Sequence, residues 1–137
     1  MGFSILIVDD EPDVAELFRQ RFRREVRAGQ YVLHFAASGE EGLRRLGEIE
    51  PELIVILSDI NMPGMDGLEL LAEIRRRRPE LPVLMVTAYA DDDRRRRAAE
   101  SGAAAFLAKP IDFDELKRRL AELVPAAPGG TGEVPGR

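Results

Sequence analysis

The sequence predicts an α/β domain: a doubly wound, five-stranded parallel sheet with helices on both faces. Short apolar runs alternate strictly with amphipathic segments along the chain, which is the pattern of repeated strand–helix units joined by right-handed crossovers. The apolar runs, such as Leu53–Leu57, are unbroken, as expected of strands buried on both faces. With 137 residues, the chain fits one domain with a sizeable core.

Each predicted strand is followed along the chain by a segment with helix-start signals. The start signals are proline or acidic residues in the first turn, or a hydroxyl or carboxylate followed three residues later by glutamate. The predicted strands are Ser4–Val8, Tyr31–Phe35, Leu53–Leu57, Val83–Val86 and Ala104–Ala108. The helix starts are Pro12–Asp13, Ser38–Glu41, Asp66–Glu69, Asp91 and Asp112–Glu115.

Two of the predicted helices have unusual features. The first is predicted to continue to Gly29, with one buried face made of Val14, Leu17, Phe18, Phe22 and Val26. The connection between this helix and the second predicted strand, around Arg23–Gln30, is also long. The segment Asp91–Ser101 has a thin apolar face, mainly Ala98 and Ala99, which is consistent with a movable element.

Composition excludes several classes of protein. The formal net charge of -5 argues against nucleic-acid binding through a general positive field. There is no cysteine, so disulfides and thiolate metal sites are excluded. No apolar run approaches the ~20 residues that cross a bilayer, and the N-terminus lacks a signal-peptide pattern. A cytoplasmic protein without membrane insertion is expected.

From Pro125 the chain is rich in proline and glycine, so residues 125–137 are predicted to be a flexible tail or linker after a domain of residues 3–124.

Polar side chains follow four of the five predicted strands. Asp9 and Asp10 follow the first, Asp59 the third, Thr87 the fourth and Lys109 the fifth. The carboxyl ends of parallel strands lie along one edge of a sheet, where open α/β folds place their sites. We therefore expect three carboxylates, a hydroxyl and an ammonium to gather at that edge.

This set predicts metal-assisted phosphoryl chemistry. Three close carboxylates resist joint ionisation, and a hard divalent cation relieves the repulsion. With His34 as the only histidine, Mg²⁺, or Mn²⁺ in its place, is the natural fit. Lys109 and Thr87 suit the outer oxygens of a phosphoryl group, and the carboxylate of Asp59 can act as the nucleophile. Eighteen of the twenty basic residues are arginine, so a lysine at position 109 hints at a need for a compact ammonium.

Four separated motifs carry a resemblance to a known family. In chain order they are ILIVDDEPD, VILSDINMPGMDG, VTAYA and FLAKP. Together they resemble the receiver domain of two-component response regulators over roughly Phe3–Val124. The resemblance implies a flavodoxin-like sheet of strand order 2-1-3-4-5, and a protein that is not a classical enzyme but catalyses its own phosphorylation and dephosphorylation.

The resemblance also implies roles for the residues at the sheet edge. Asp59 matches the phosphoacceptor and Lys109 the lysine that pairs with the phosphoryl group. Asp10 matches a direct Mg²⁺ ligand, Asp9 an acid that helps to hold the metal, and Asn61 the position whose backbone carbonyl reaches it.

A second set matches the elements that transmit the signal. Thr87 matches the switch hydroxyl, Phe106 the switch aromatic, and Pro110 a proline that follows a cis bond. Phe106 replaces the commoner tyrosine and so lacks a phenol hydroxyl.

The implied function is a switch controlled by phosphorylation. A sensor histidine kinase or a histidine phosphotransfer protein would donate the phosphoryl group. The output would use the face built from the segment 91–101, the strand 104–108 and the last helix, and a homodimer of the phosphorylated form is left open. The cognate kinase, the output and the lifetime of the phosphorylated state cannot be predicted from the sequence.

Other interpretations remain open at this point. A Mg²⁺-dependent phosphatase with an aspartyl-phosphate intermediate would want an acid two residues after the nucleophile, where this chain has Asn61 after Asp59 and Glu11 after Asp9. A non-phosphorylated interaction module of the same fold is a third hypothesis. The runs Arg75–Arg78 and Arg94–Arg97 are interpreted as solvated helix surface, since acidic residues accompany them.

Overall fold

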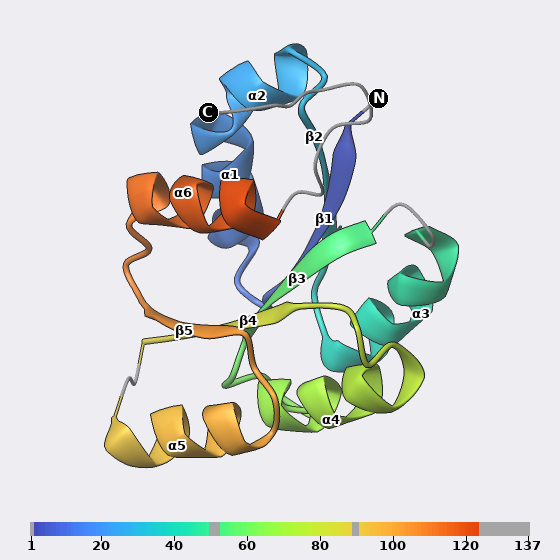
Figure 1. The fold of residues 1–137 in the computed structure, drawn as a ribbon, viewed down its shortest axis with the longest axis vertical. Helices are drawn as coiled ribbons and strands as arrows, with labels where there is room; N and C mark the ends of the chain where they lie inside the picture. Colours follow the sequence, from blue (N-terminus) through green and yellow to red (C-terminus); the bar gives the residue numbers. More distant parts are fainter. Residues whose placement is uncertain (1, 50–52, 89–90, 124–137) are drawn as a thin grey trace.

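The predicted sheet is present in the computed structural model, which describes residues 2–49, 53–88 and 91–123. Five parallel strands are ordered β2-β1-β3-β4-β5 (Figure 1). They are β1 (Phe3–Val8), β2 (Tyr31–Ala36), β3 (Leu53–Asp59), β4 (Val83–Thr87) and β5 (Ala105–Ala108). The fold class and the strand order are therefore both confirmed. β3 and β4 run further than expected, so that Asp59 and Thr87 are the last residues of their strands.

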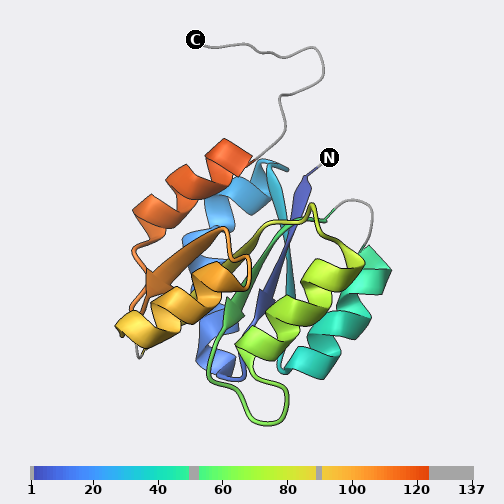
Figure 2. The same ribbon diagram turned by 60° about the horizontal axis from the view of Figure 1, so that its bottom comes forward.

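Helices cover both faces of the sheet (Figure 2). On one face lie α1 (Pro12–Arg21) and α6 (Phe113–Leu123), and the short α2 (Arg23–Arg27) follows α1 beside β2 (Figure 1). On the other face lie α3 (Gly39–Ile49), α4 (Gly67–Arg77) and α5 (Asp92–Glu100). None of the helices in these described ranges is both long and apolar enough to cross a membrane.

Two hydrophobic cores form because successive side chains of a strand point to opposite faces. Ile5 and Ile7 of β1 pack with the α1–α6 core, while Leu6 and Val8 pack with the core under α3 and α4. The α1–α6 core contains an aromatic cluster with ring centroids 5.1–6.2 Å apart. Its rings are those of Phe18, Phe22, Tyr31 and Phe113.

The prediction of one continuous first helix is wrong, because the helix ends at Phe22. That residue is the C-cap of α1, with φ -104° and ψ 11°, and its ring is fully buried in the aromatic cluster. The chain changes direction there and α2 begins, which leaves Val26 42% exposed. Leu17 is 39% exposed because it lies about 100° around the helix from Phe18, which takes the core position.

Of the two predicted capping boxes, the one at α4 is complete and the one at α3 is partial. At α4, the backbone N–H of Glu69 donates to Asp66 Oδ1 (2.8 Å) and that of Asp66 donates to Glu69 Oε1 (2.9 Å). At α3, the N–H of Glu41 donates to Ser38 Oγ (3.1 Å), but the Glu41 carboxylate accepts from the N–H of Ala37 (2.7 Å) rather than from Ser38. Both starts thus satisfy backbone donors that a helix leaves unpaired.

The fourth predicted helix, α5, has an even thinner apolar face than expected. Ala98 is fully buried, but Ala99 is exposed, which corrects the prediction for that residue. The arginine runs are surface residues, as expected: Arg76 pairs with Glu73, and Arg96 pairs with Asp93. The predicted tail, residues 125–137, lies outside the described residues.

Candidate functional site

The carboxyl edge of the sheet gathers the polar residues that the sequence placed after the strands. Asp9 follows β1, Asp59 ends β3, Thr87 ends β4 and Lys109 follows β5. Carboxylate oxygens of Asp9, Asp10 and Asp59 all lie within 4.8 Å of one another. The structure therefore brings the predicted carboxylates together, with Asp59 buried, Asp9 half-buried and Asp10 exposed at the rim.

Lys109 is the cation at the centre of this edge. Its Nζ lies 2.9 Å from Asp9 Oδ2, 3.0 Å from Glu11 Oε1 and 3.3 Å from Asp59 Oδ2. Its backbone N–H donates to the carbonyl of Thr87, which fixes the residue to the neighbouring strand end. A single ammonium thus bridges the ends of β1, β3 and β5.

Glu11 is a site residue that the sequence reasoning did not assign. Its backbone N–H donates to Asp9 Oδ1 at 2.9 Å, and its own carboxylate accepts from Lys109. The available signal was its place directly after Asp9-Asp10 at the end of a strand.

Burial and like charge both act on the carboxylate of Asp59. Asp59 is 7% exposed, and burial together with the neighbouring charge of Asp9 raises the pKa of Asp59, which the Lys109 ammonium only partly offsets. Burial alone would lower the pKa of Lys109, but hydrogen bonds to Asp9 and Glu11 outweigh it and raise that pKa above its ordinary value. Lys109 therefore stays protonated across the physiological range.

The donor set fits a hard divalent cation. The three clustered side chains of Asp9, Asp10 and Asp59 offer only carboxylate oxygens, which Mg²⁺ and Mn²⁺ prefer, and no described histidine joins them. His34 instead lies on the edge strand β2, with Nε2 3.1 Å from Ser4 Oγ. Exposed Asp10 leaves the cluster accessible from solvent.

Asn61 connects Asp59 to the end of β4. Its backbone N–H donates to Asp59 Oδ1 at 3.3 Å, and its side-chain Nδ2 donates to Thr87 Oγ1 at 3.1 Å. Thr87 is fully buried. The side chain of Asn61, and not only its carbonyl, thus has a defined contact; the metal-facing role of the carbonyl stays a prediction.

The loop after Asp59 is held against the strand end by close backbone packing. The N–H of Gly67 donates to the carbonyl of Ile60 at 2.7 Å. A Cβ at position 67 would lie 2.1 Å from the carbonyl oxygen of Asp59 and 2.7 Å from Ile60 Cα. Only glycine allows α4 to begin this close to Asp59.

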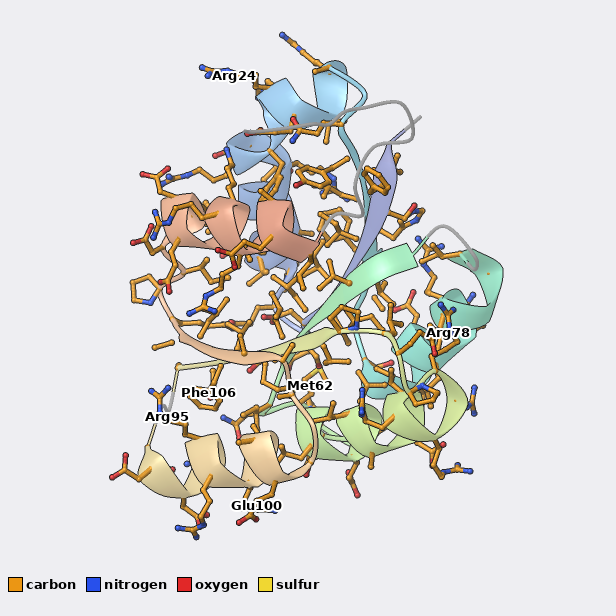
Figure 3. The ribbon with its side chains drawn as sticks, in the orientation of Figure 1. Arg24, Met62, Arg78, Arg95, Glu100 and Phe106 are labelled. Carbon is orange, nitrogen blue, oxygen red and sulfur yellow. The ribbon has the colours of Figure 1, made fainter. Side chains whose placement is uncertain are left out.

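Phe106 lies on β5 on the side of α5, half-buried, with the guanidinium of Arg95 4.7 Å from its ring centroid (Figure 3). Its side chain packs against the core under α3 and α4. The Lys109–Pro110 peptide bond is cis, as the resemblance implied. The switch roles of Thr87 and Phe106 stay predictions.

Replacing Asp59 with asparagine is expected to stabilise the fold in magnesium-free buffer at neutral pH by about 1 kcal/mol. A carboxyl whose folded pKa is raised favours folding of its neutral form, so wild type loses stability as pH rises from the ordinary carboxyl pKa through the raised one. Urea denaturation of both proteins at pH 7 and at acid pH measures the difference, which should vanish below the ordinary pKa. Asp114→Asn, at an exposed position of α6, is the control. An Asp59→Asn protein less stable than wild type at neutral pH would contradict the prediction.

Comparison with known proteins places this chain in a family. The sequence model of the response regulator receiver domain matches residues 5–121. The chain is 34% identical to the transcriptional regulatory protein GlrR of Escherichia coli over 129 residues, which cover 94% of this chain and 28% of that protein. It is 39% identical to the DNA-binding transcriptional regulator NtrC of Escherichia coli over 111 residues, or 81% of this chain and 22% of that protein. The chain thus spans between about a fifth and three tenths of the length of these relatives.

Solved structures show the same likeness over whole chains. The chemotaxis protein CheY4 of Vibrio cholerae has a TM-score of 0.79 at 27% identity, covering 90% of this chain and 100% of that chain. The response regulator protein TrrA of Thermotoga maritima, solved in complex with Mg²⁺-BeF, has a TM-score of 0.75 at 32% identity, covering 89% of this chain and 99% of that one. With the family match over residues 5–121, the fold and the acidic sheet edge, the chain belongs to the receiver domains of two-component response regulators.

Proposed function

We propose that this receiver domain accepts a phosphoryl group on the carboxylate of Asp59 from a phosphohistidine of a sensor histidine kinase or a phosphotransfer protein. One observation carries the proposal: the buried Asp59 carboxylate lies beside two further carboxylates and 3.3 Å from the Lys109 ammonium, at the end of a central strand. Such a carboxylate can act as a nucleophile, and the ammonium beside it supplies positive charge next to the oxygens of the incoming phosphoryl group.

The transfer needs a nucleophile, groups that stabilise charge on the phosphoryl oxygens, and a leaving group. An oxygen of Asp59 attacks the phosphorus in line, the P–N bond to the donor imidazole breaks, and that nitrogen keeps the bonding electron pair and takes up a proton. Lys109 Nζ, already 3.3 Å from Asp59 Oδ2, donates hydrogen bonds to the phosphoryl oxygens. Thr87 Oγ1 supplies a further hydroxyl from the end of β4. Hydrolysis of the acyl phosphate by water then restores Asp59.

Asp10, Asp9, Asp59 and the carbonyl of Asn61 would hold Mg²⁺, or Mn²⁺ in its place. When bound, the cation neutralises charge on the acidic cluster and on the transferring group. The ammonium of Lys109 cannot balance three carboxylates and the incoming phosphoryl group alone, and this shortfall supports the assignment.

The output would pass through the face made of α5, β5 and α6. Phe106 lies on that face under Arg95, and Ala98 is the only buried residue of α5, so little apolar packing holds this helix. The relatives bear the names of transcriptional regulators, and an output domain in the same protein is part of the proposal. The cytoplasmic location, the cognate kinase pairing and a homodimer of the phosphorylated form stay predictions.

Intact mass spectrometry tests the acceptor directly. Incubation of the full chain with Mg²⁺ and acetyl phosphate should add one phosphoryl group to wild type and to Asp114→Asn, and none to Asp59→Asn. EDTA should prevent the addition. Modification of Asp59→Asn at the wild-type rate, or no modification of wild type under any condition, would refute the proposal. Steady turnover of p-nitrophenyl phosphate would favour the phosphatase hypothesis instead.

The switch is testable by NMR with a phosphoryl mimic. Addition of Mg²⁺ and beryllofluoride should shift backbone amides of β5 and α5, around Phe106, in wild type. Thr87→Ala should still bind the mimic, but the shifts around Phe106 should fall by more than half, because the hydroxyl that links the acceptor to β4 is gone. Equal shifts in both proteins would contradict a switch role for Thr87.

A further inference from the structure

A groove runs between α1–α2 and the edge strand β2, away from the acidic site. It has a volume of about 560 Å³, and we call it the α2 groove. Its apolar lining includes two of the most exposed large hydrophobic residues among those described, Val26 and Val32, each 42% exposed. Its remaining side-chain lining includes Arg19, Arg23, Arg27 and Phe35, with no acidic residue. The groove is therefore apolar along its floor and positive along its rim.

Several neighbouring arginines around α2 lack a carboxylate partner. Arg21, Arg23, Arg24 and Arg27 form no ion pair with any described carboxylate. By contrast, Arg44 of α3, Arg76 of α4 and Arg96 of α5 each pair with an acid three or four residues away on the same helix. Unpaired arginines are common singly at a surface, but four within seven residues create a local positive field on a chain of net charge -5.

The positive surface continues on the other side of α2. A second hollow of about 500 Å³ is lined by Arg21, Arg24 and Lys117, together with Arg23 and Arg27 from the α2 groove. Two acids lie nearby, and both are engaged: Glu25 is 2.9 Å from Lys117, and Glu16 is 3.6 Å from Arg19. Arg24 projects outward from α2 (Figure 3). Arg23, Arg24 and Arg27, which pair with no described carboxylate, can thus meet an anionic partner.

We propose that the α2 groove binds an acidic, amphipathic segment of a partner protein. Carboxylates of the segment would pair with Arg23 and Arg27, and its apolar side chains would cover Val26 and Val32, as when an amphipathic helix lies in a hydrophobic groove. The apolar floor distinguishes this occupant from a nucleic acid, whose phosphates would use the rim alone. Arginine at such a rim also suits bidentate pairing with carboxylates.

The place of the groove gives it a separate role from the acceptor site. α2 is followed directly by the amino end of β2 at Tyr31, whereas Asp59 lies at the carboxyl end of the parallel sheet. α2 itself thus lies at the end of the sheet opposite the acidic edge (Figure 1). The proposal therefore does not depend on phosphorylation of Asp59.

The test uses the full chain and a defined probe. The probe is a fluorescein-labelled helical peptide of about 15 residues, with leucine on one face and glutamate on the other. Fluorescence anisotropy should show saturable binding that weakens with added salt, and NMR should place the shifted amides on α2 and β2. Arg23→Gln/Arg27→Gln should weaken binding about tenfold, and Val26→Gln should weaken it several-fold. Arg76→Gln/Arg96→Gln, which removes the same charge from α4 and α5, should bind as wild type does.

Four results would overturn the proposal. Binding of a peptide in which serine replaces every leucine, as tight as that of the probe, would show that only charge matters. A single-stranded oligonucleotide of equal charge that binds more tightly, and equally in Val26→Gln, would assign the surface to nucleic acid. Self-association of the full chain in sedimentation, lost in Arg23→Gln/Arg27→Gln, would assign the groove to a second copy. Absence of any probe binding at low salt would also refute it.

Discussion

Replacing Gly67 with alanine is expected to destabilise the domain by about 3 kcal/mol and to impair phosphoryl acceptance at the same time. The added Cβ would lie 2.1 Å from the carbonyl oxygen of Asp59 and 2.7 Å from Ile60 Cα. Both are backbone atoms of the segment that presents the acceptor, so no side-chain rotation can relieve the clash. Either α4 shifts outward or the end of β3 moves, and both changes displace the carboxylate of Asp59 from Lys109.

Gly47→Ala provides the matched control. A Cβ at Gly47, in the last turn of α3, meets nothing within 4 Å, so alanine should stabilise the domain by about 0.5 kcal/mol through its higher helix propensity. Urea denaturation gives both changes in free energy, and intact mass with acetyl phosphate gives the rate of acceptance. An unfolding midpoint of Gly67→Ala equal to that of wild type would show that the loop after β3 yields more easily than its packing indicates.

Lys109→Met is expected to slow phosphoryl acceptance at least about 100-fold and to destabilise the fold at neutral pH by about 2 kcal/mol. The substitution leaves the carboxylates of Asp9, Glu11 and Asp59 without their shared ammonium. The loss of stability is smaller than for a fully dry ion pair, because Lys109 is 17% exposed and Glu11 faces solvent. The loss of rate is larger because the ammonium also opposes the charge that develops on the phosphoryl oxygens.

Magnesium distinguishes the electrostatic cause from a packing defect. If uncompensated carboxylate charge causes the instability, Mg²⁺ should raise the unfolding midpoint of Lys109→Met more than that of wild type. Lys117→Met is the control: it removes the chain's other lysine, which pairs with Glu25 and lies over the Phe22 ring. It should accept the phosphoryl group at the wild-type rate. A Lys109→Met protein that reacts as fast as wild type would contradict the role of this ammonium.

Local sequence signals are sufficient to predict the sheet and the identity of most of the site. Unbroken apolar runs report burial on both faces, and their strict alternation with helices permits only parallel strands, whose carboxyl ends share an edge. The positions of Asp9, Asp59, Thr87 and Lys109 follow from that rule alone, because each comes within two residues of the end of a predicted strand. Helix starts at Pro12 and Asp66 were equally local signals, since a cap depends on residues within one turn.

Contacts between residues far apart in the chain depend instead on how the elements pack. Glu11 joins the site because the end of β5 brings Lys109 to it, and periodicity carries no information about a pair separated by 98 residues. The break at Phe22 came from the aromatic cluster, which overrode a continuous helical pattern and left Leu17 and Val26 exposed. The need for glycine at position 67 arises from the backbone of Asp59, which lies earlier in the chain but is folded back against it. Local patterns determine which side chains face a core or an edge, whereas close packing between elements determines which of them meet.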